Sequence, residues 1–143
     1  MPIQQGTCTV FKQNCLSGLE NFAVGTPYTY KIALYTSFAD IGPNTLVYTA
    51  ANELPSGNGY TTTGLVLTPI PPASNAQTLT AYVSFEDAIW APASFTARGA
   101  LIYNSTTGAA VAVLDFGSDK TATSAFTVSF PTATATTAII RFA

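Results

Sequence analysis

The chain has 143 residues, which suit a single domain over residues 1–143, and it carries a net charge of −2 with no histidine. Only 8% of its residues are charged, against about 25% in an ordinary soluble domain. Its five cations are scattered, which argues against nucleic-acid binding. No apolar run approaches the ~20 residues of a membrane-spanning helix, which argues against membrane insertion. Because histidine is the commonest general base and the commonest metal ligand, its absence argues against an enzyme, and we expect no catalytic residue, cofactor or metal ion.

The first predicted element is a helix over residues 7–22. Its apolar side chains recur at spacings of three and four residues and form one stripe, made of Cys8, Phe11, Cys15, Leu19 and Phe22. Thr7 or Thr9 can cap its start, and Gly25 follows its end. Two interpretations stay open: the helix packs against its own domain, or it docks on a neighbouring subunit, in which case Phe11 is an interface residue.

The two cysteines, Cys8 and Cys15, lie seven positions apart on this helix. At a rise of 1.5 Å per residue they are about 10.5 Å apart along the axis, whereas a disulfide needs Cα atoms within about 7 Å. We therefore expect two reduced, largely buried thiols. The first residues lack the basic and apolar regions of a signal peptide, and both observations indicate synthesis in a reducing host cytoplasm.

After Pro27 the apolar period changes to two, and residues 27–143 are predicted to form strands. The predicted strands cover residues 28–35, 45–49, 60–70, 79–85, 95–103, 109–116, 126–130 and 137–142. Segments rich in turn-forming residues are expected to interrupt them at residues 37–44, 52–59, 69–75 and 104–108. Seven or eight strands at this spacing favour a mainly β fold, an antiparallel β-sandwich or jelly-roll-like barrel with one short N-terminal helix.

Three side chains on the predicted outer faces of strands are candidates for contacts with a partner. Tyr35 and Tyr82 are the outward aromatic residues, while Trp90 and most of the seven tyrosines are expected to pack in the core rather than form a sugar-binding platform. Arg98 lies opposite a hydrophobic row, either as a surface charge or as a contact between subunits. The candidate interface is therefore Phe11, Tyr35, Tyr82 and Arg98.

Two acidic motifs need a structural rather than a catalytic interpretation. Glu86 and Asp87 are neighbours on a strand, so they point to opposite faces and do not converge as an acid–base pair. The segment 115–120 contains an Asp-Phe-Gly triplet without the other motifs of a kinase. It is expected to be a glycine turn with side-chain hydrogen bonds from aspartate, and it offers too few carboxylates for calcium.

Several short segments, in chain order, carry a resemblance to a known family. They are Phe11-Lys-Gln13 with Leu16-Ser-Gly18, Lys31-Ile-Ala-Leu-Tyr-Thr-Ser37, Asn52-Glu53 with Gly57-Asn-Gly-Tyr-Thr61, Phe95-Thr-Ala-Arg-Gly-Ala-Leu-Ile-Tyr-Asn104 and Ala110-Val-Ala-Val-Leu-Asp-Phe-Gly117. Together they span nearly the whole chain and resemble a recurrent small structural protein of tailed bacteriophages. The resemblance implies a place in the virion and no catalytic residues.

The function expected from these observations is a non-enzymatic virion protein. A surface so poor in charge is expected to be covered by partners. The leading hypothesis is a capsid decoration or cement protein that stabilises the head, as a homo-oligomer in contact with the major capsid protein. The alternative is a component of the tail, collar or fibre, including one that contacts the host surface. A glycan-binding adhesin is a weaker hypothesis, and an enzyme acting on the cell wall is the weakest.

Overall fold

The computed structural model describes residues 2–143, and within them the fold is mainly β, with antiparallel pairing and one short helix, as the sequence predicts. Along the chain the elements are β1 (Gly6–Thr7), α1 (Thr9–Leu16), β2 (Tyr30–Tyr35), β3 (Leu65–Val66), β4 (Pro69–Asn75), β5 (Thr80–Phe85), β6 (Ala88–Trp90), β7 (Thr96–Asn104), β8 (Ala110–Thr121), β9 (Phe126–Val128) and β10 (Ile140–Phe142). The described residues form ten strands rather than the seven or eight expected, because β1, β4 and β6 lie mostly or wholly outside the predicted strands. The predicted strand over residues 45–49 is absent, and only Val47 forms an isolated bridge, with Ala109.

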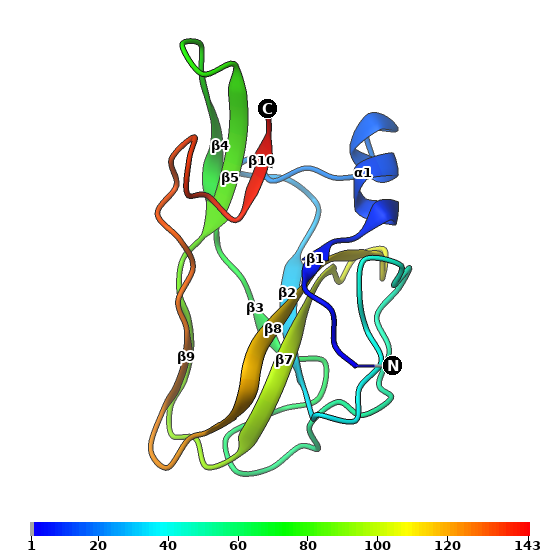
Figure 1. Cartoon of the computed structure of the whole chain (residues 1–143), viewed down its shortest axis with the longest axis vertical. Helices are drawn as coiled ribbons and strands as arrows, with labels where there is room; N and C mark the ends of the chain where they lie inside the picture. Colours follow the sequence, from blue (N-terminus) through cyan, green and yellow to red (C-terminus); the bar gives the residue numbers. More distant parts are fainter. Residues whose placement is uncertain (1) are drawn as a thin grey trace.

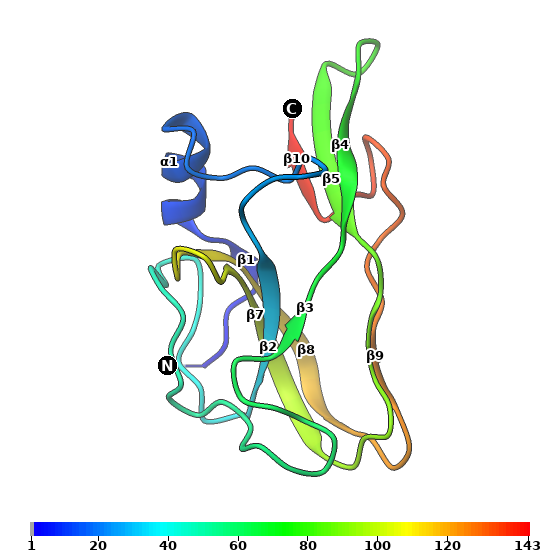
Figure 2. The ribbon, with the colours of Figure 1, turned by 180° about the vertical axis from the view of Figure 1, so that it is seen from behind.

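The strands form three antiparallel sheets (Figures 1 and 2). The main sheet has the order β1-β8-β7-β2-β3, a second sheet has the order β10-β5-β4, and β6 pairs with β9. The β4–β5 hairpin extends beyond the main sheet at one end of the molecule, and α1 lies at the same end (Figure 1). This arrangement is compatible with a β-sandwich.

The β7–β8 hairpin is confirmed, and β2 completes the centre of the main sheet. β2 pairs with β7 from Tyr30 opposite Asn104 to Tyr35 opposite Gly99. The side chains of β2 are buried on both faces, because the long connection over residues 36–64 covers the face that is predicted to be outward. The prediction that Tyr35 faces outward is therefore wrong: its exposed fraction is 0%.

The helix is shorter than the predicted span of residues 7–22. Thr7 belongs to β1 and pairs with Ala112, so the helix begins after Cys8, which makes no side-chain capping bond. It ends early because Gly18 adopts a φ of +73°, and the amide of Leu19 donates to the carbonyl of Asn14 over 2.8 Å. This left-handed glycine closes the last turn of the helix, seven residues before the expected Gly25.

The proline-rich segment 69–75, predicted to be a loop, is strand β4. It pairs only with β5, so it is an edge strand that donates hydrogen bonds on one side. The register with β5 shifts between Ile70 and Ala73, where Pro71 and Pro72 lie. Edge strands and bulges are the places in a sheet that tolerate proline, because the missing N–H is not needed there.

The Asp-Phe-Gly segment lies within β8 rather than between strands, but the expected local hydrogen bond is present. The amide of Gly117, which has a φ of +81°, donates to Asp115 Oδ1 over 2.9 Å. The register with β7 jumps from Ala97 opposite Lys120 to Gly99 opposite Asp115, so the intervening residues of β8 bulge out. The predicted turn is thus a bulge in a long strand.

Candidate interaction surface

Two of the four predicted interface residues lie in the core. Phe11 and Tyr35 both have an exposed fraction of 0%. Phe11 packs against Phe22, with ring centroids 5.9 Å apart, and Phe22 stacks on Tyr30 at 4.4 Å. Neither Phe11 nor Tyr35 presents a surface to a partner, so both are removed from the candidate interface. For α1, packing on its own domain is the interpretation that the burial of Phe11 supports.

The carboxylate of Glu53 organises the covered face of the main sheet. Its Oε1 accepts hydrogen bonds from the Tyr60 hydroxyl at 2.6 Å and from the Thr63 amide at 2.7 Å, and its Oε2 accepts one from the Tyr48 hydroxyl. Burial, together with the bond to Glu53, raises the pKa of both tyrosines above the ordinary value. Both oxygens are thus satisfied, and the group links three segments of the 36–64 connection to one another. The Tyr60 hydroxyl also accepts a hydrogen bond from the Leu34 amide of β2 at 3.0 Å, which ties this network to the sheet.

Other aromatic residues are also buried in the core. The Tyr35 hydroxyl donates to the Thr49 carbonyl at 2.6 Å, and the Tyr103 hydroxyl donates to the Thr63 carbonyl at 2.5 Å. Trp90 has an exposed fraction of 5% and packs edge-on against phenylalanine rings. Tyr103 and Trp90 pack in the core as predicted, whereas Tyr35 does so against the prediction. The buried Trp90 does not offer a platform for a sugar.

Arg98 is half-exposed and already has a partner in its own chain. Its Nε lies 3.3 Å from Asp115 Oδ1, and about 30% of each side chain is exposed. An exposed pair of this kind contributes only about 0–1 kcal/mol. The geometry supports a surface charge opposite the β8 bulge, and a role of Arg98 between subunits stays a prediction.

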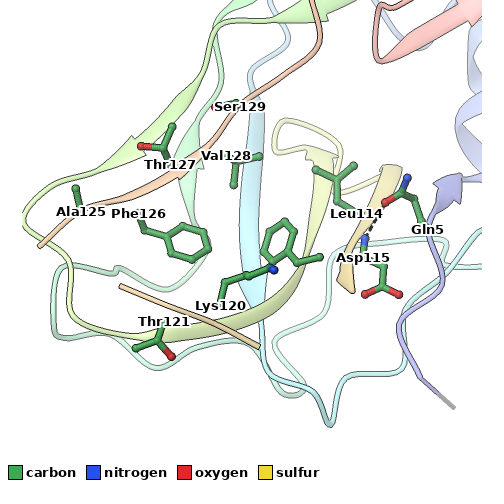
Figure 3. A pocket seen from close by; sticks show the side chains of 11 residues that line it. Gln5, Leu114, Asp115, Lys120, Thr121, Ala125, Phe126, Thr127, Val128 and Ser129 are labelled. Atoms are coloured by element: carbon green, nitrogen blue, oxygen red, sulfur yellow. Dashed lines mark hydrogen bonds between the residues drawn. The ribbon is translucent and has the colours of Figure 1, made fainter. Parts of the chain in front are cut away.

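A hollow of about 510 Å³ lies between β8 and β9 (Figure 3). Its lining mixes apolar side chains, such as Leu114 and Phe126, with Gln5, Asp115 and Lys120. Its charged side chains are one carboxylate, Asp115, and one amine, Lys120, and it contains no thiol. Across residues 2–143 there is also no cluster of acidic or thiol side chains that could hold a metal ion.

A smaller groove of about 120 Å³ is formed where α1 faces β5 and β10; we call it the α1–β10 groove. Its walls are largely apolar, and its lining includes Phe11, Phe22, Tyr82, Val83, Ile140 and Phe142. Tyr82, half-buried, is the one predicted interface aromatic that keeps some exposure, and it belongs to this groove. Phe142 is 50% exposed at its rim.

Glu20 is the acidic residue of the α1–β10 groove, and sequence reasoning did not single it out. Its Oε1 accepts hydrogen bonds from the Tyr30 hydroxyl at 3.0 Å and from Asn104 Nδ2 at 2.8 Å. Its Oε2 is buried and has no hydrogen-bond partner among the described residues. Burial raises the pKa of the Glu20 carboxyl, and its interactions with the Asn104, Tyr30 and Asn14 side chains only partly offset that rise.

The thiols behave as expected of unlinked cysteines. Both are free; Cys8 is fully buried and Cys15, which lines the α1–β10 groove, is half-buried. Burial raises the pKa of each thiol to about 11, and for Cys15 the charge of Glu20 adds to the rise. Both are therefore protonated at neutral pH and are poor nucleophiles.

No helix in the described part of the chain is long and apolar enough to span a membrane. The chain matches no protein-family model, no curated protein and no solved structure.

Proposed function

We propose that the chain is a non-enzymatic structural protein of a tailed-phage virion, and that it decorates the capsid and stabilises the head. One observation carries the proposal: a surface with very few charges exposes many large apolar side chains. Within residues 2–143 these are Leu16, Leu19, Val24, Phe38, Leu46, Val47, Val66, Leu79, Ile89 and Phe142, with exposed fractions from 49% to 91%. Isolated exposed apolar residues are normal on a protein surface. Here, however, only 8% of the residues are charged, so few charged side chains are present to keep such a surface soluble.

Such a surface supports binding inside an assembly. Apolar area removed from water contributes about 25 cal/mol per Å², from which the cost of ordering is subtracted. On a closed shell, many copies in contact with neighbouring capsid subunits combine modest individual contacts into high avidity. The resemblance to small phage structural proteins agrees with this proposal.

Quantitative mass spectrometry of purified particles tests the proposal. A decoration protein is expected on the order of hundreds of copies per particle, because it follows the symmetry of the shell. A copy number of about a dozen or fewer would favour a ring or trimer in the tail, collar or fibre instead. Absence of the chain from purified particles would overturn the virion assignment.

A rebinding experiment tests the physical basis of the contact. Purified protein added to particles that lack it should bind comparably at ~0.05 and ~0.5 M salt, although the screening length falls about threefold over this range. Contacts made by apolar and hydroxyl groups are weakly screened, whereas contacts between exposed charges are lost. Loss of most binding at the higher salt would indicate that charged residues such as Arg98 make the contact instead.

A further inference from the structure

One side of the hollow between β8 and β9 is a free sheet edge. β9 pairs only with β6, and the amide of Phe130 donates to Asp87 Oδ1, on the β6 side, over 3.0 Å. Because successive amides along a strand point to opposite sides, those of Thr127 and Ser129 point away from β6. Both residues line the hollow, and neither amide donates a hydrogen bond within residues 2–143. β9 thus presents unpaired backbone donors to the hollow.

This edge lacks the features that usually prevent a strand from pairing with another chain. Residues 125–129 include no proline and no charged side chain. The edge strand β4, by contrast, carries Pro71 and Pro72 in its centre. Proteins protect exposed edges with proline, charge or a covering segment, and an unprotected edge is a template for an added strand. The β9 edge is therefore suited to recognition by strand addition.

The hollow supplies apolar walls for the side chains of such a strand. Phe126 and Leu114 lie on opposite sides of it, and Phe116 is also in its lining (Figure 3). Alternate side chains of a strand point to the same face, so every second residue of an added strand would meet these walls. The volume of about 510 Å³ lies within the range of roughly 300–1,000 Å³ that is typical of ligand sites, which leaves room for a short extended segment.

The charged groups of the hollow favour an acidic segment. Lys120 is exposed and forms no ion pair or hydrogen bond in the described part of the chain. Asp115 is already bound, because its Oδ1 accepts hydrogen bonds from the Arg98 guanidinium and from the Gly117 amide. The lysine is thus the charge that stays open to a ligand, and a carboxylate is the group that an ammonium binds best.

We propose that this hollow binds an extended acidic segment of a partner protein, which adds as a strand to β9. The backbone of the segment exchanges hydrogen bonds with Thr127 and accepts one from the Ser129 amide, its alternate apolar side chains contact the walls, and its carboxylate lies near Lys120. Only an extended chain offers backbone acceptors at the spacing of these amides. The site belongs to the isolated chain, so it goes beyond the virion assignment and does not rest on it.

A peptide titration followed by NMR tests the site. The probe is acetyl-Val-Thr-Val-Thr-Val with a free C-terminal carboxylate, added to the isotope-labelled full chain. It should bind with a Kd of about 1 mM or lower, and the amide signals of Thr127 and Ser129 should shift. Two N-methylated forms of the probe, blocked at the valine amides or at the threonine amides, distinguish strand addition from apolar contact alone. One form should lose binding and the other retain it, since only one side of an added strand faces β9.

A pair of proline variants tests the free edge. Thr127→Pro removes an amide that faces the hollow, and should raise the Kd of the probe about tenfold or more. Ile89→Pro is the matched control: Ile89 lies opposite Thr127 in β6, and its amide points away from β9, outside the hollow, so the Kd should stay within about twofold. Proline is tolerated where a strand amide is unpaired, and circular dichroism verifies that both variants are folded.

The contribution of Lys120 is tested with the two ends of the probe. Lys120→Gln should raise the Kd of the carboxylate probe by about threefold, because exposed ion pairs are weak. A probe with a C-terminal amide should bind the variant and the unchanged chain equally.

Four outcomes overturn the proposal. The first is a chain that does not bind the probe at about 5 mM. The second is equal binding of the two N-methylated forms, and the third is equal weakening by Thr127→Pro and Ile89→Pro. The fourth is a Thr127 amide that becomes protected from hydrogen exchange as the chain alone is concentrated, which would assign the edge to a second copy. Each of these leaves the virion assignment standing, and absence of the chain from particles would leave the peptide site standing.

Discussion

Two carboxylates in this chain lie beside tyrosine hydroxyls, and only one of them is fully satisfied. Glu53 accepts three hydrogen bonds through both oxygens, all from residues of the 36–64 connection that covers the main sheet. Glu20 accepts bonds from Tyr30 and Asn104 through Oε1, while its buried Oε2 has no partner. Similar groups thus complete a satisfied hydrogen-bond network in one region and leave a buried oxygen without a partner in the other. The first network stabilises the fold, whereas burial of the second carboxylate costs free energy when it is charged.

The largest expected effect is the loss of the closed network. Glu53→Ala removes the acceptor of Tyr48, Tyr60 and the Thr63 amide, and should lower the free energy of unfolding by about 3 kcal/mol. The midpoint of urea denaturation measures the change, provided that the slope is unaltered. The control is Asp119→Ala, at an exposed position, for which a change below about 0.5 kcal/mol is expected. Equal effects of the two variants would show that the network contributes nothing specific.

A smaller effect separates the two tyrosines that the sequence places together on outer faces. Tyr35→Phe removes a buried donor to the Thr49 carbonyl, and should cost about 1 kcal/mol of stability. Tyr82→Phe should leave stability unchanged, because no hydrogen bond involves the Tyr82 hydroxyl in residues 2–143. Both variants are compared by urea denaturation. A Tyr35→Phe variant as stable as Tyr82→Phe would contradict the burial of the Tyr35 hydroxyl beneath the 36–64 connection.

The smallest expected effect is a pH dependence that belongs to Glu20. Its pKa is raised in the folded chain, mainly by burial, so folding favours the protonated form. The stabilisation is complete below the ordinary glutamate pKa of about 4.3 and is lost as the pH rises through the raised value. Cys15 adds no charge there, because its own pKa is about 11.

The pH series compares the urea denaturation of the unchanged chain with that of Glu20→Gln. From about pH 4 upward, the stability of the unchanged chain should fall relative to that of the variant. If the difference in stability is constant with pH, or if the unchanged chain gains stability relative to the variant as the pH rises, burial does not raise the pKa of Glu20.

Local patterns explain why some elements were predictable. The alternation in residues 79–85 and 95–103 depends only on which side chains share a face, and β5 and β7 form there. The bond from the Gly117 amide to Asp115 spans two residues, so its prediction needed no knowledge of the β8 bulge around it. By contrast, the helix boundary was wrong because Gly18 competes with an apolar stripe that continues to Phe22.

Composition and periodicity by themselves determined that this chain is mainly β, that one helix comes first and that its thiols stay unlinked. Only the tertiary structure decided which strand faces are covered. Tyr35 is buried because a connection of many residues folds back over β2, and proline is tolerated in β4 because that strand lies at an edge. Glu20 meets Asn104 across 84 positions of sequence, and such a contact follows from packing, since no local pattern encodes which distant segments approach one another.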